Sequence, residues 1–512
     1  MKNQKIIFLI VFLMLMALFC IGQEQFISPH PGKLHIIPSF ITLTNGKTVP
    51  YEEGLLFVKE NRNNPKSRVA AVHFIRFKAK PSVNGLPVFY LFGGPGSSIS
   101  IQKLKSKWGQ RTIEFFSSIG DLIFVDQRGN ANARFMPEMK VDIRSLPLDR
   151  LCTSSDYSEA LGEGLQEAVY KWKKRGVDIS GYDIFHVVDD VNVLRKALGY
   201  EKIILRGNSF GSQWAISFIK RYPQYVERAL LGGVEPLNFC YDMPTDVWSA
   251  MKRIAKLADS DPDLKPVISK SGLAKIIKNL IKSLSNNPVH TNITHPQTGK
   301  QIEVIIGKHD LQRVLKNFSE DYYTRKGLSK WPRFFLEMDR GDFRYLAWLT
   351  YKNRRDKHYP LIFFTIDNSL GINTKRELTI LKDPAKDILG NINEIYFSTR
   401  CLTPIPDVGD EFRSDFFVNV PVLLIQGNLD MDTPVENAIH MRKYLRNGHL
   451  LYVENGSHLA ISEVRDFFPA VAEEILEFLR EGDFSGIPDR VSLPAPDFET
   501  LIGASLYERL FA

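Results

Sequence analysis

The segment KIILRGNSFG, residues 202–211, places a serine between an apolar run and the helix-like stretch QWAISFIKRYP. Its last five residues fit the pattern GxSxG, which in a strand-turn-helix setting holds a nucleophilic serine in a sharp turn. Small residues flank the serine there because the neighbouring backbone comes too close for a Cβ atom. The N-terminus of the following helix favours a developing negative charge. We therefore predict that Ser209 is a nucleophile.

A serine hydroxyl needs a general base, and the base needs an orienting carboxylate, in the chain order Ser, Asp, His for this turn. His458 in ENGSHLA follows the apolar run HLLYVE and is the predicted base. Asp430 in GNLDMDTP directly follows PVLLIQ and is the predicted acid. Asp432 could instead cap the next segment through backbone N–H groups near Thr433. Packing or surface positions are expected for His186, His440 and His449.

A glycine-rich loop, GGPG at residues 93–96, follows the apolar run PVFYLF. Such a loop can bring a backbone N–H group close to a substrate carbonyl oxygen, although a plain turn is the alternative. Gly93 and Gly94 are therefore predicted to form an oxyanion hole together with the N–H group of Phe210. Each donor of such a hole stabilises the transition state by about 2.7–4 kcal/mol.

Short apolar runs, each ending in a glycine-rich or acidic turn, recur along the chain, and every candidate group follows one of them. Runs of this length suit strands buried on both faces, as in a parallel sheet covered by helices. Between two runs, VVDDVNVLRKALG has the 3.6-residue period of a helix. The alternation predicts an α/β fold, with a mostly parallel sheet flanked by helices and the site at the carboxyl ends of the strands.

The length of 512 residues exceeds one ordinary hydrophobic core, so an inserted domain is expected. Helical stretches mixed with aromatic residues fill the region between two predicted core strands, which is typical of a helical cap. We predict five segments: a signal peptide at 1–22, a first core part at 23–241, the cap at 242–415, a second core part at 416–482 and a C-terminal surface extension at 483–512.

The N-terminus has the pattern of a secretory signal peptide: Lys2 and Lys5, then the apolar run Ile6–Ile21, then polar residues. Those sixteen apolar residues fall short of the ~20 that span a bilayer, so no stable membrane insertion is expected after cleavage following Gly22. Lipid attachment at Cys20 is the weaker alternative. The protein is predicted to be exported to the periplasm or the extracellular space.

Cleavage would leave Cys152, Cys240 and Cys401 in an oxidising compartment, which allows at most one disulfide plus one free thiol. One structural disulfide is expected, and its pairing is left open. The chain contains no CxxC pair, so neither a metal nor a redox role is expected of these cysteines. The formal charge of +8 comes from scattered Lys and Arg without interleaved aromatic residues, and no nucleic acid partner is expected.

Four segments together resemble the proline iminopeptidase and tripeptidyl aminopeptidase family of α/β-hydrolases: GGPGSS, DLIFVDQRG, the stretch from VVDDVN to GGVEP around GNSFG, and VPVLLIQGNLDMDTP with its later GSH. The resemblance implies Ser209 as nucleophile, Asp430 as acid, His458 as base and no cofactor or metal. Two departures border the site: Phe92 stands where the family usually has His, and NANAR follows DQRG in place of Gly and Ser.

The resemblance implies an aminopeptidase that cleaves an N-terminal residue or a short peptide from a small peptide substrate. A carboxylesterase with the same three residues is the alternative, and a non-catalytic binding module is a further one. An aminopeptidase must hold a free amino group, because a buried ammonium without a partner is unfavourable. Glu235, Glu337 and Asp339 are available, but each is expected to be a solvated surface carboxylate.

Overall fold

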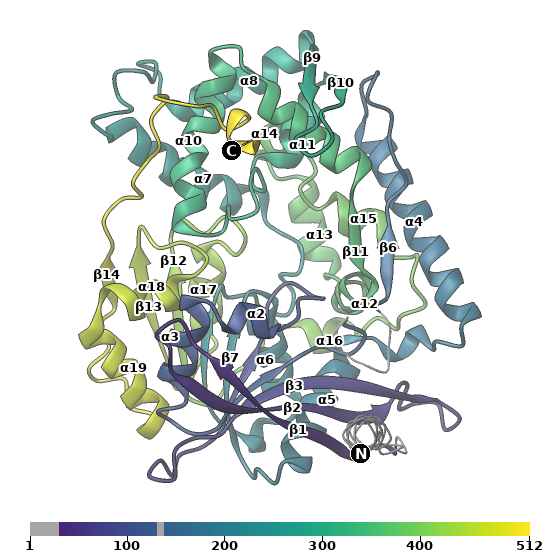
Figure 1. Cartoon of the computed structure of the whole chain (residues 1–512), viewed down its shortest axis with the longest axis vertical. Helices are drawn as coiled ribbons and strands as arrows, with labels where there is room; N and C mark the ends of the chain where they lie inside the picture. The colour runs from purple at the N-terminus through teal and green to yellow at the C-terminus, as the bar shows by residue number, and fades with distance from the viewer. Residues whose placement is uncertain (1–29, 131–137, 512) are drawn as a thin grey trace, which may run out of the picture.

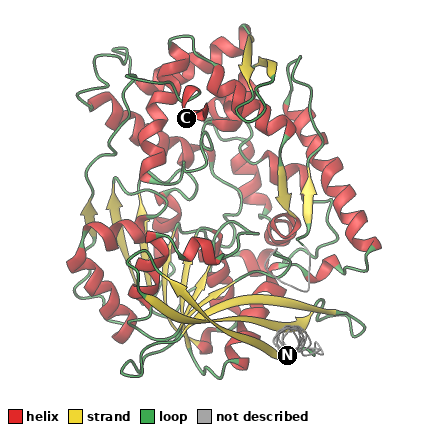
Figure 2. Cartoon of the chain, in the orientation of Figure 1, coloured by secondary structure: helices red, strands yellow, loops and turns green. Residues whose placement is uncertain are grey.

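The computed structural model describes residues 30–130 and 138–511. Within them, a ten-stranded sheet runs in the order β1-β2-β3-β5-β4-β7-β8-β12-β13-β14. The first four strands of that order pair antiparallel, and every neighbouring pair from β5 to β14 is parallel. The sheet lies in the lower half of Figure 1, and Figure 2 shows mostly helices and loops above it, with two short pairs of strands. The predicted α/β fold is confirmed.

Each strand of this sheet is defined by its backbone hydrogen bonds to its neighbours. In chain order they are β1 Leu34–Thr42, β2 Thr48–Lys59, β3 Val69–Phe77, β4 Val88–Leu91, β5 Leu122–Val125, β7 Ile203–Asn208, β8 Val226–Gly232, β12 Val422–Gly427, β13 Gly448–Glu454 and β14 Arg490–Ser492. Because β4, β7, β8, β12 and β13 are parallel, their carboxyl ends lie at one edge of the sheet.

Successive residues of the central strands face opposite sides of the sheet. Ile203 and Leu205 of β7 pack in one buried cluster, whereas Ile204 packs in another. Helices cover both sides, which is why the strands read as unbroken apolar runs. One face is covered by α5 (Ile184–Ala197), α6 (Phe210–Arg221) and α17 (Val435–Arg442), and the other by α3 (Lys107–Phe116), α18 (Ala460–Phe467) and α19 (Pro469–Glu481).

A mainly helical body is inserted between β8 and β12, as expected of a cap. The exact boundaries at residues 242 and 415 stay a prediction. Large apolar residues of this body, among them Trp331 and Phe335, form a buried cluster of their own. Its helices are α7 Pro244–Ser260, α8 Leu273–Asn286, α9 Lys308–Val314, α10 Arg325–Asp339, α11 Arg344–Arg355, α12 Leu361–Leu370, α13 Thr374–Leu381, α14 Lys386–Leu389, α15 Glu394–Thr399 and α16 Asp410–Arg413.

Two further pairs of strands lie outside the main sheet. The first, β9 (Val289–Thr294) with β10 (Gln301–Ile306), is a hairpin within the insertion. The second joins β11 (His358–Pro360) to β6 (Lys140–Asp142), which precedes the nucleophile in the chain. Helix α4 (Ser154–Lys174) lies beside α15 in Figure 1, so residues from before β7 also support the inserted body.

The C-terminal residues run from β14 to the top of the helical body, where the C-terminus lies in Figure 1. Arg333 of α10 donates hydrogen bonds to the carbonyl oxygens of Thr500 and Ala504, each at 2.6 Å. Phe498 and Leu506 are buried in the same apolar cluster as α10. The segment therefore ties the inserted body to the sheet.

The predicted disulfide is wrong, because Cys152, Cys240 and Cys401 are all free. Cys152 packs against Leu146 ahead of α4, and Cys240 packs against Tyr241 in a different buried cluster. Cys401 is exposed. Separate packing environments keep the three thiols apart.

The predicted signal peptide at 1–22, including Cys20, lies outside the described residues and stays a prediction. Among residues 30–130 and 138–511, no helix combines the length and the apolar character that crossing a bilayer requires. Most of the NANAR stretch also lies outside the described residues, which resume at residue 138.

The packing of Gly211 generates a prediction about stability. A Cβ atom at Gly211 would lie 2.2 Å from the carbonyl oxygen of Leu91 in β4, whereas at Gly162 in α4 it would meet only the side chain of Leu402 at 3.3 Å. We expect Gly211→Ala to lower the free energy of unfolding by about 1–3 kcal/mol or more through overpacking. Gly162→Ala is the control and should be neutral or stabilising by up to about 1 kcal/mol. Denaturant unfolding of both variants measures the difference, and equal stabilities would contradict the close packing.

Candidate active site

Ser209 occupies a strained turn between β7 and α6. Its φ of 59° and ψ of −137° are unusual for a residue other than glycine, and such strain is concentrated at functional sites. A Cβ atom at Gly207 would lie 2.2 Å from the carbonyl oxygen of Gly211. The two glycines of GNSFG are thus required by the close backbone, as the sequence predicted.

His458 and Asp430 are brought together from two different loops. The Nδ1 atom of His458 lies 2.8 Å from Oδ2 of Asp430, which is fully buried after β12. The same carboxylate accepts hydrogen bonds from Nε2 of Gln426 at 2.9 Å, from the hydroxyl of Thr433 at 2.7 Å and from the backbone N–H groups of Asp432 and Thr433. This set of donors keeps a buried carboxylate ionised.

The electrostatics of this pair are reciprocal. Burial opposes ionisation of both groups, yet the imidazole of His458 holds the pKa of Asp430 below its ordinary value. Burial lowers the pKa of His458, but the charge of Asp430 and its hydrogen bond outweigh that effect and raise the pKa of the imidazole to about 9. The imidazolium form is therefore strongly stabilised by its partner.

Asp432 takes a different position from Asp430. Its carboxylate lies 3.2 Å from Nζ of Lys316, and it lines the cavity in front of Ser209. Lys316 comes from the inserted body and also pairs with Asp242 at 2.9 Å. Of the two aspartates of GNLDMDTP, Asp430 contacts His458, whereas Asp432 forms an ion pair with Lys316 of the inserted body.

The ring of His458 and the backbone of Ser209 lie on two sides of Gly233, which follows β8. A Cβ atom at Gly233 would lie 2.8 Å from the N atom of Ser209 and 2.9 Å from Cε1 of His458. The side chain of Asn208 also donates a hydrogen bond to the carbonyl oxygen of His458 at 3.3 Å. The turn after β8 therefore brings the predicted base next to the predicted nucleophile.

The GGPG loop lies against the same serine. A Cβ atom at Gly93 would lie 2.8 Å from Cβ and 3.5 Å from Oγ of Ser209. Gly94 and Pro95 line the cavity together with Ser209 and Phe210. Phe210 is the first residue of α6, whose opening N–H groups have no partner within the helix. The three backbone positions expected around an oxyanion, Gly93, Gly94 and Phe210, thus lie together beside Ser209.

The cavity over Ser209 has a volume of about 360 Å³ and lies between the carboxyl ends of the strands and the inserted body. Two of its carboxyl groups, Glu235 and Asp367, form no ion pair with a Lys or Arg side chain in the part of the chain that the structure describes. Burial and the neighbouring Asp367 raise the pKa of Glu235 well above its ordinary value. Burial raises the pKa of Asp367 to about 8.

The expectation of solvated surface carboxylates is corrected for two of the three residues. Glu235 lines the cavity because the hydroxyl of Ser212 accepts a hydrogen bond from its N–H group at 2.9 Å and fixes the turn after β8. Glu337 is buried beside Arg333, at 2.7 Å, and accepts the N–H group of Leu506. Asp339 is exposed, as expected.

Asp367 was not anticipated from the sequence. It lies in α12, within the apolar stretch LIFFTIDNSL, and no motif surrounds it. A single acid in a strongly apolar helix is the one signal that could have indicated a buried polar role. Its place in the cavity depends on how the inserted body folds over the sheet.

Phe92, at the position where the resembling family usually has His, lies in an aromatic cluster outside the cavity. Phe92 is buried and stacks on Phe124 at a ring distance of 5.8 Å, with Tyr90 at 5.0 Å. It does not line the cavity. Within the described residues, no cluster of three His, Cys, Asp or Glu side chains could hold a metal ion.

Comparison with known proteins adds a family match. Residues 403–490, which include Asp430 and His458, match the family described as TAP-like protein. A 197-residue region is 29% identical to serine protease Hip1 of Mycobacterium tuberculosis and of Mycobacterium bovis. The match covers 36% of this chain and 36% of each relative, so the chain spans about a third of the length of the curated relatives it matches.

Solved structures align over most of the chain at low similarity. A serine hydrolase from Cycloclasticus zankles aligns over 87% of this chain and 100% of that one, with 11% identity and a TM-score of 0.35. An esterase from Exiguobacterium antarcticum aligns over 86% and 99%, with 12% identity and a TM-score of 0.33.

The strand order and the turn at Ser209 decide the fold by themselves. A largely parallel sheet that presents a serine between its central strand and the next helix is the arrangement of the nucleophile elbow. The chain therefore has the α/β-hydrolase fold, and its residues 403–490 match the family of TAP-like proteins.

Proposed function

We propose that the protein is a serine exopeptidase that releases an N-terminal residue or a short peptide through an acyl-enzyme. The observation that carries this proposal is the cavity in which Ser209 lies together with the unpaired carboxyl groups of Glu235 and Asp367. A substrate with a free amino group would supply the positive charge that this pair lacks, and a blocked peptide or a simple ester would not. The resemblance to a named serine protease supports peptide hydrolysis.

The proposed mechanism starts with attack of the Ser209 hydroxyl on the substrate carbonyl carbon while His458 removes the hydroxyl proton. Asp430 holds the imidazole in one tautomer through Nδ1 and stabilises the imidazolium. The oxyanion accepts hydrogen bonds from the backbone of Phe210 and of the Gly93–Gly94 region. His458 then protonates the departing amine, and water releases the acyl group in a second cycle of the same steps.

Recognition of the amino group follows from the charge balance of the cavity. Lys316 neutralises Asp242 and Asp432, and Arg313 pairs with Glu394, whereas Glu235 and Asp367 form no ion pair with a Lys or Arg side chain within the described residues. Burial raises the pKa values of both carboxyl groups, and for Glu235 it outweighs the opposing charge of Lys316. An ammonium group placed between them would favour their ionised forms, and the resulting ion pairs would hold the N-terminus of the substrate.

Export is part of the proposal and rests on residues 1–22 alone. The basic residues followed by the apolar run Ile6–Ile21 support a cleaved secretory signal. N-terminal sequencing of the protein recovered from the extracellular or periplasmic fraction would show a mature chain beginning after Gly22.

The substrate class can be tested with three matched compounds: an aminoacyl amide, the same amide with an acylated amino group, and a short acyl ester. We expect the unblocked amide to have the highest kcat/KM, and Ser209→Ala to reduce it by about 10⁴-fold or more. Hydrolysis of the ester alone would establish the carboxylesterase alternative. Full activity of Ser209→Ala would exclude the mechanism, and binding without turnover of any compound would favour a binding module.

The pH dependence of Ser209 reactivity tests the assignment of the base. Labelling by an uncharged fluorophosphonate requires neutral His458, whose pKa is raised to about 9, so the rate should rise with pH well beyond the ordinary histidine value of about 6.5. Asp430→Asn should slow labelling and move the midpoint to lower pH, because the stabilisation of the imidazolium is lost. Asp415→Asn, which removes the exposed partner of His440, is the control and should change neither property.

The carboxyl pair is tested by Glu235→Gln and Asp367→Asn. Loss of a buried ion pair costs about 2 kcal/mol or more, so KM for the unblocked amide should rise at least tenfold in each variant. The constants for the blocked amide should stay unchanged, which separates amine recognition from misfolding. Glu394→Gln removes a cavity carboxylate already paired with Arg313 and should preserve the preference for the unblocked amide. An unchanged preference in the first two variants would contradict the role of the pair.

A further inference from the structure

The DQRG stretch after β5 is in direct contact with the GGPG loop. The Oε1 atom of Gln127 accepts a hydrogen bond from the N–H group of Gly96 at 2.6 Å. One residue earlier, Oδ1 of Asp126 accepts the N–H group of Ile99 at 2.8 Å. Both side chains are buried, so these bonds are shielded from water. Gly96 and Ile99, which follow Gly94 in the chain, are therefore hydrogen-bonded to the residues that follow β5.

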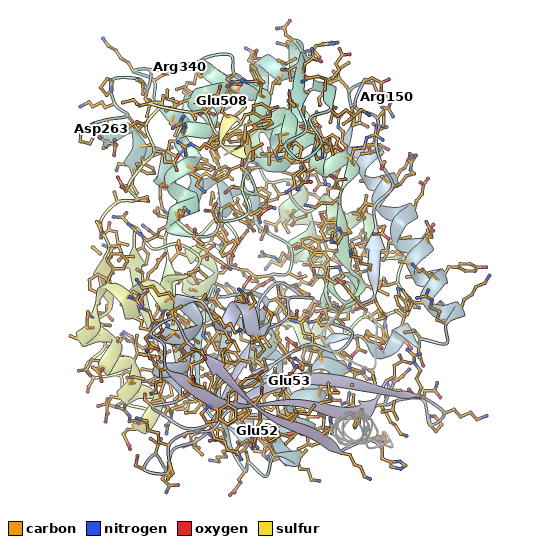
Figure 3. The ribbon with its side chains drawn as sticks, in the orientation of Figure 1. Glu52, Glu53, Arg150, Asp263, Arg340 and Glu508 are labelled. Carbon is orange, nitrogen blue, oxygen red and sulfur yellow. The ribbon has the colours of Figure 1, made fainter. Side chains whose placement is uncertain are left out.

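Asp126 is itself held by a second histidine. Nδ1 of His73 on β3 lies 2.8 Å from Oδ2 of Asp126, and Nε2 of the same ring lies 3.1 Å from Oε1 of Glu53 on β2. Glu53 is labelled in Figure 3, on the antiparallel part of the sheet. The two carboxylates outweigh the burial of His73 and raise its pKa to about 9, so the imidazolium is the neutral-pH form. Asp126 thus links His73 of β3 to the N–H group of Ile99.

The backbone of the DQRG stretch is anchored as well. Arg128 is fully buried and donates to both carboxylate oxygens of Asp190 in α5, at 2.6 and 2.7 Å. It also donates to the carbonyl oxygens of Glu60 and Gly181. A buried bidentate ion pair restricts the orientation of the Arg128 guanidinium. Because Gln127 directly precedes Arg128, this restraint also fixes the position of the Gln127 side chain that contacts Gly96.

The loop needs such support because its own sequence gives it little rigidity. Gly94 and Gly96 adopt φ values of 40° and 93°, which glycine reaches without strain, and glycine backbones are the most mobile when unrestrained. An oxyanion hole acts through donors that are already in position when charge develops, so mobile donors lose most of their effect.

We propose that Gln127 and Asp126 are positioning residues that fix the GGPG loop as an oxyanion hole. This inference rests on the proposed function, since it assigns the loop to the oxyanion of that reaction. Neither residue lines the cavity, so both act through the loop and not by touching the substrate. The DQRG stretch thereby acquires a defined role: Arg128 anchors it, and its first two residues hold the loop.

The test uses Gln127→Met, which keeps the length of the side chain and removes the acceptor, beside Gln127→Glu, which retains an acceptor oxygen. With the best substrate, we expect kcat of Gln127→Met to fall by about 10- to 100-fold with KM changed by less than about threefold, because the donors act in the transition state. A boronic acid inhibitor, which forms a tetrahedral adduct on Ser209, should bind more weakly by a similar factor. Gln127→Glu should recover most of both losses.

Tyr200→Phe is the control, since it removes a partly buried hydrogen bond to Asp121 at the other end of β5. It should leave kcat, KM and inhibitor binding unchanged. A wild-type kcat in Gln127→Met, or an equal loss of kcat in Tyr200→Phe, would overturn the proposal. The activity of Ser209→Ala tests the proposed reaction separately, so the two failures can be distinguished. If Gln127→Met does not fold, His73→Gln should show the same kcat and inhibitor losses, and its failure to do so would count against the proposal equally.

Discussion

The close approach of three backbone segments at Ser209 is the constraint on which the rest of the site depends: the end of β4 with its loop, the serine turn and the turn after β8. The carbonyl oxygen of Leu91 leaves no room for a Cβ atom at Gly211, and the serine itself leaves none at Gly93. Gly233 occupies the remaining side, between the serine backbone and the ring of His458. Parallel strands place these segments at one edge of the sheet, and glycine at each contact allows them to meet. The strained φ of Ser209 is maintained by this packing.

The carboxyl groups of this site have pKa values that are shifted in opposite directions. Asp430 is buried but surrounded by N–H and O–H donors and by His458, so its pKa lies below the ordinary value. Glu235 and Asp367 form no ion pair with a Lys or Arg side chain within the described residues, and the loss of solvent around them raises their pKa values. The environment, and not the residue type, separates a carboxylate that stays ionised beside His458 from two carboxyl groups whose protonated forms are favoured.

The inserted body and the sheet are joined at the acid-bearing turn after β12. Lys316 reaches Asp432 from the inserted body, and Arg253 of α7 donates to the carbonyl oxygen of Asn428 at 3.1 Å. These contacts flank Asp430 on both sides, and the C-terminal segment adds a further tie through Arg333. The geometry of the His458–Asp430 pair is therefore coupled to the same helices that line the cavity.

The sequence by itself determined the fold and the order of the reactive groups, because unbroken apolar runs, a GxSxG turn and the residues at strand ends are local patterns with few structural solutions. Ser209, Asp430, His458 and the GGPG loop could all be placed from such patterns. Only the tertiary structure decided that the three cysteines are unpaired, that Glu337 is buried, and that Asp367 of α12 faces Glu235 in the cavity. These properties arise from the packing of helices far apart in the chain, and no local pattern encodes which side chains such packing brings together.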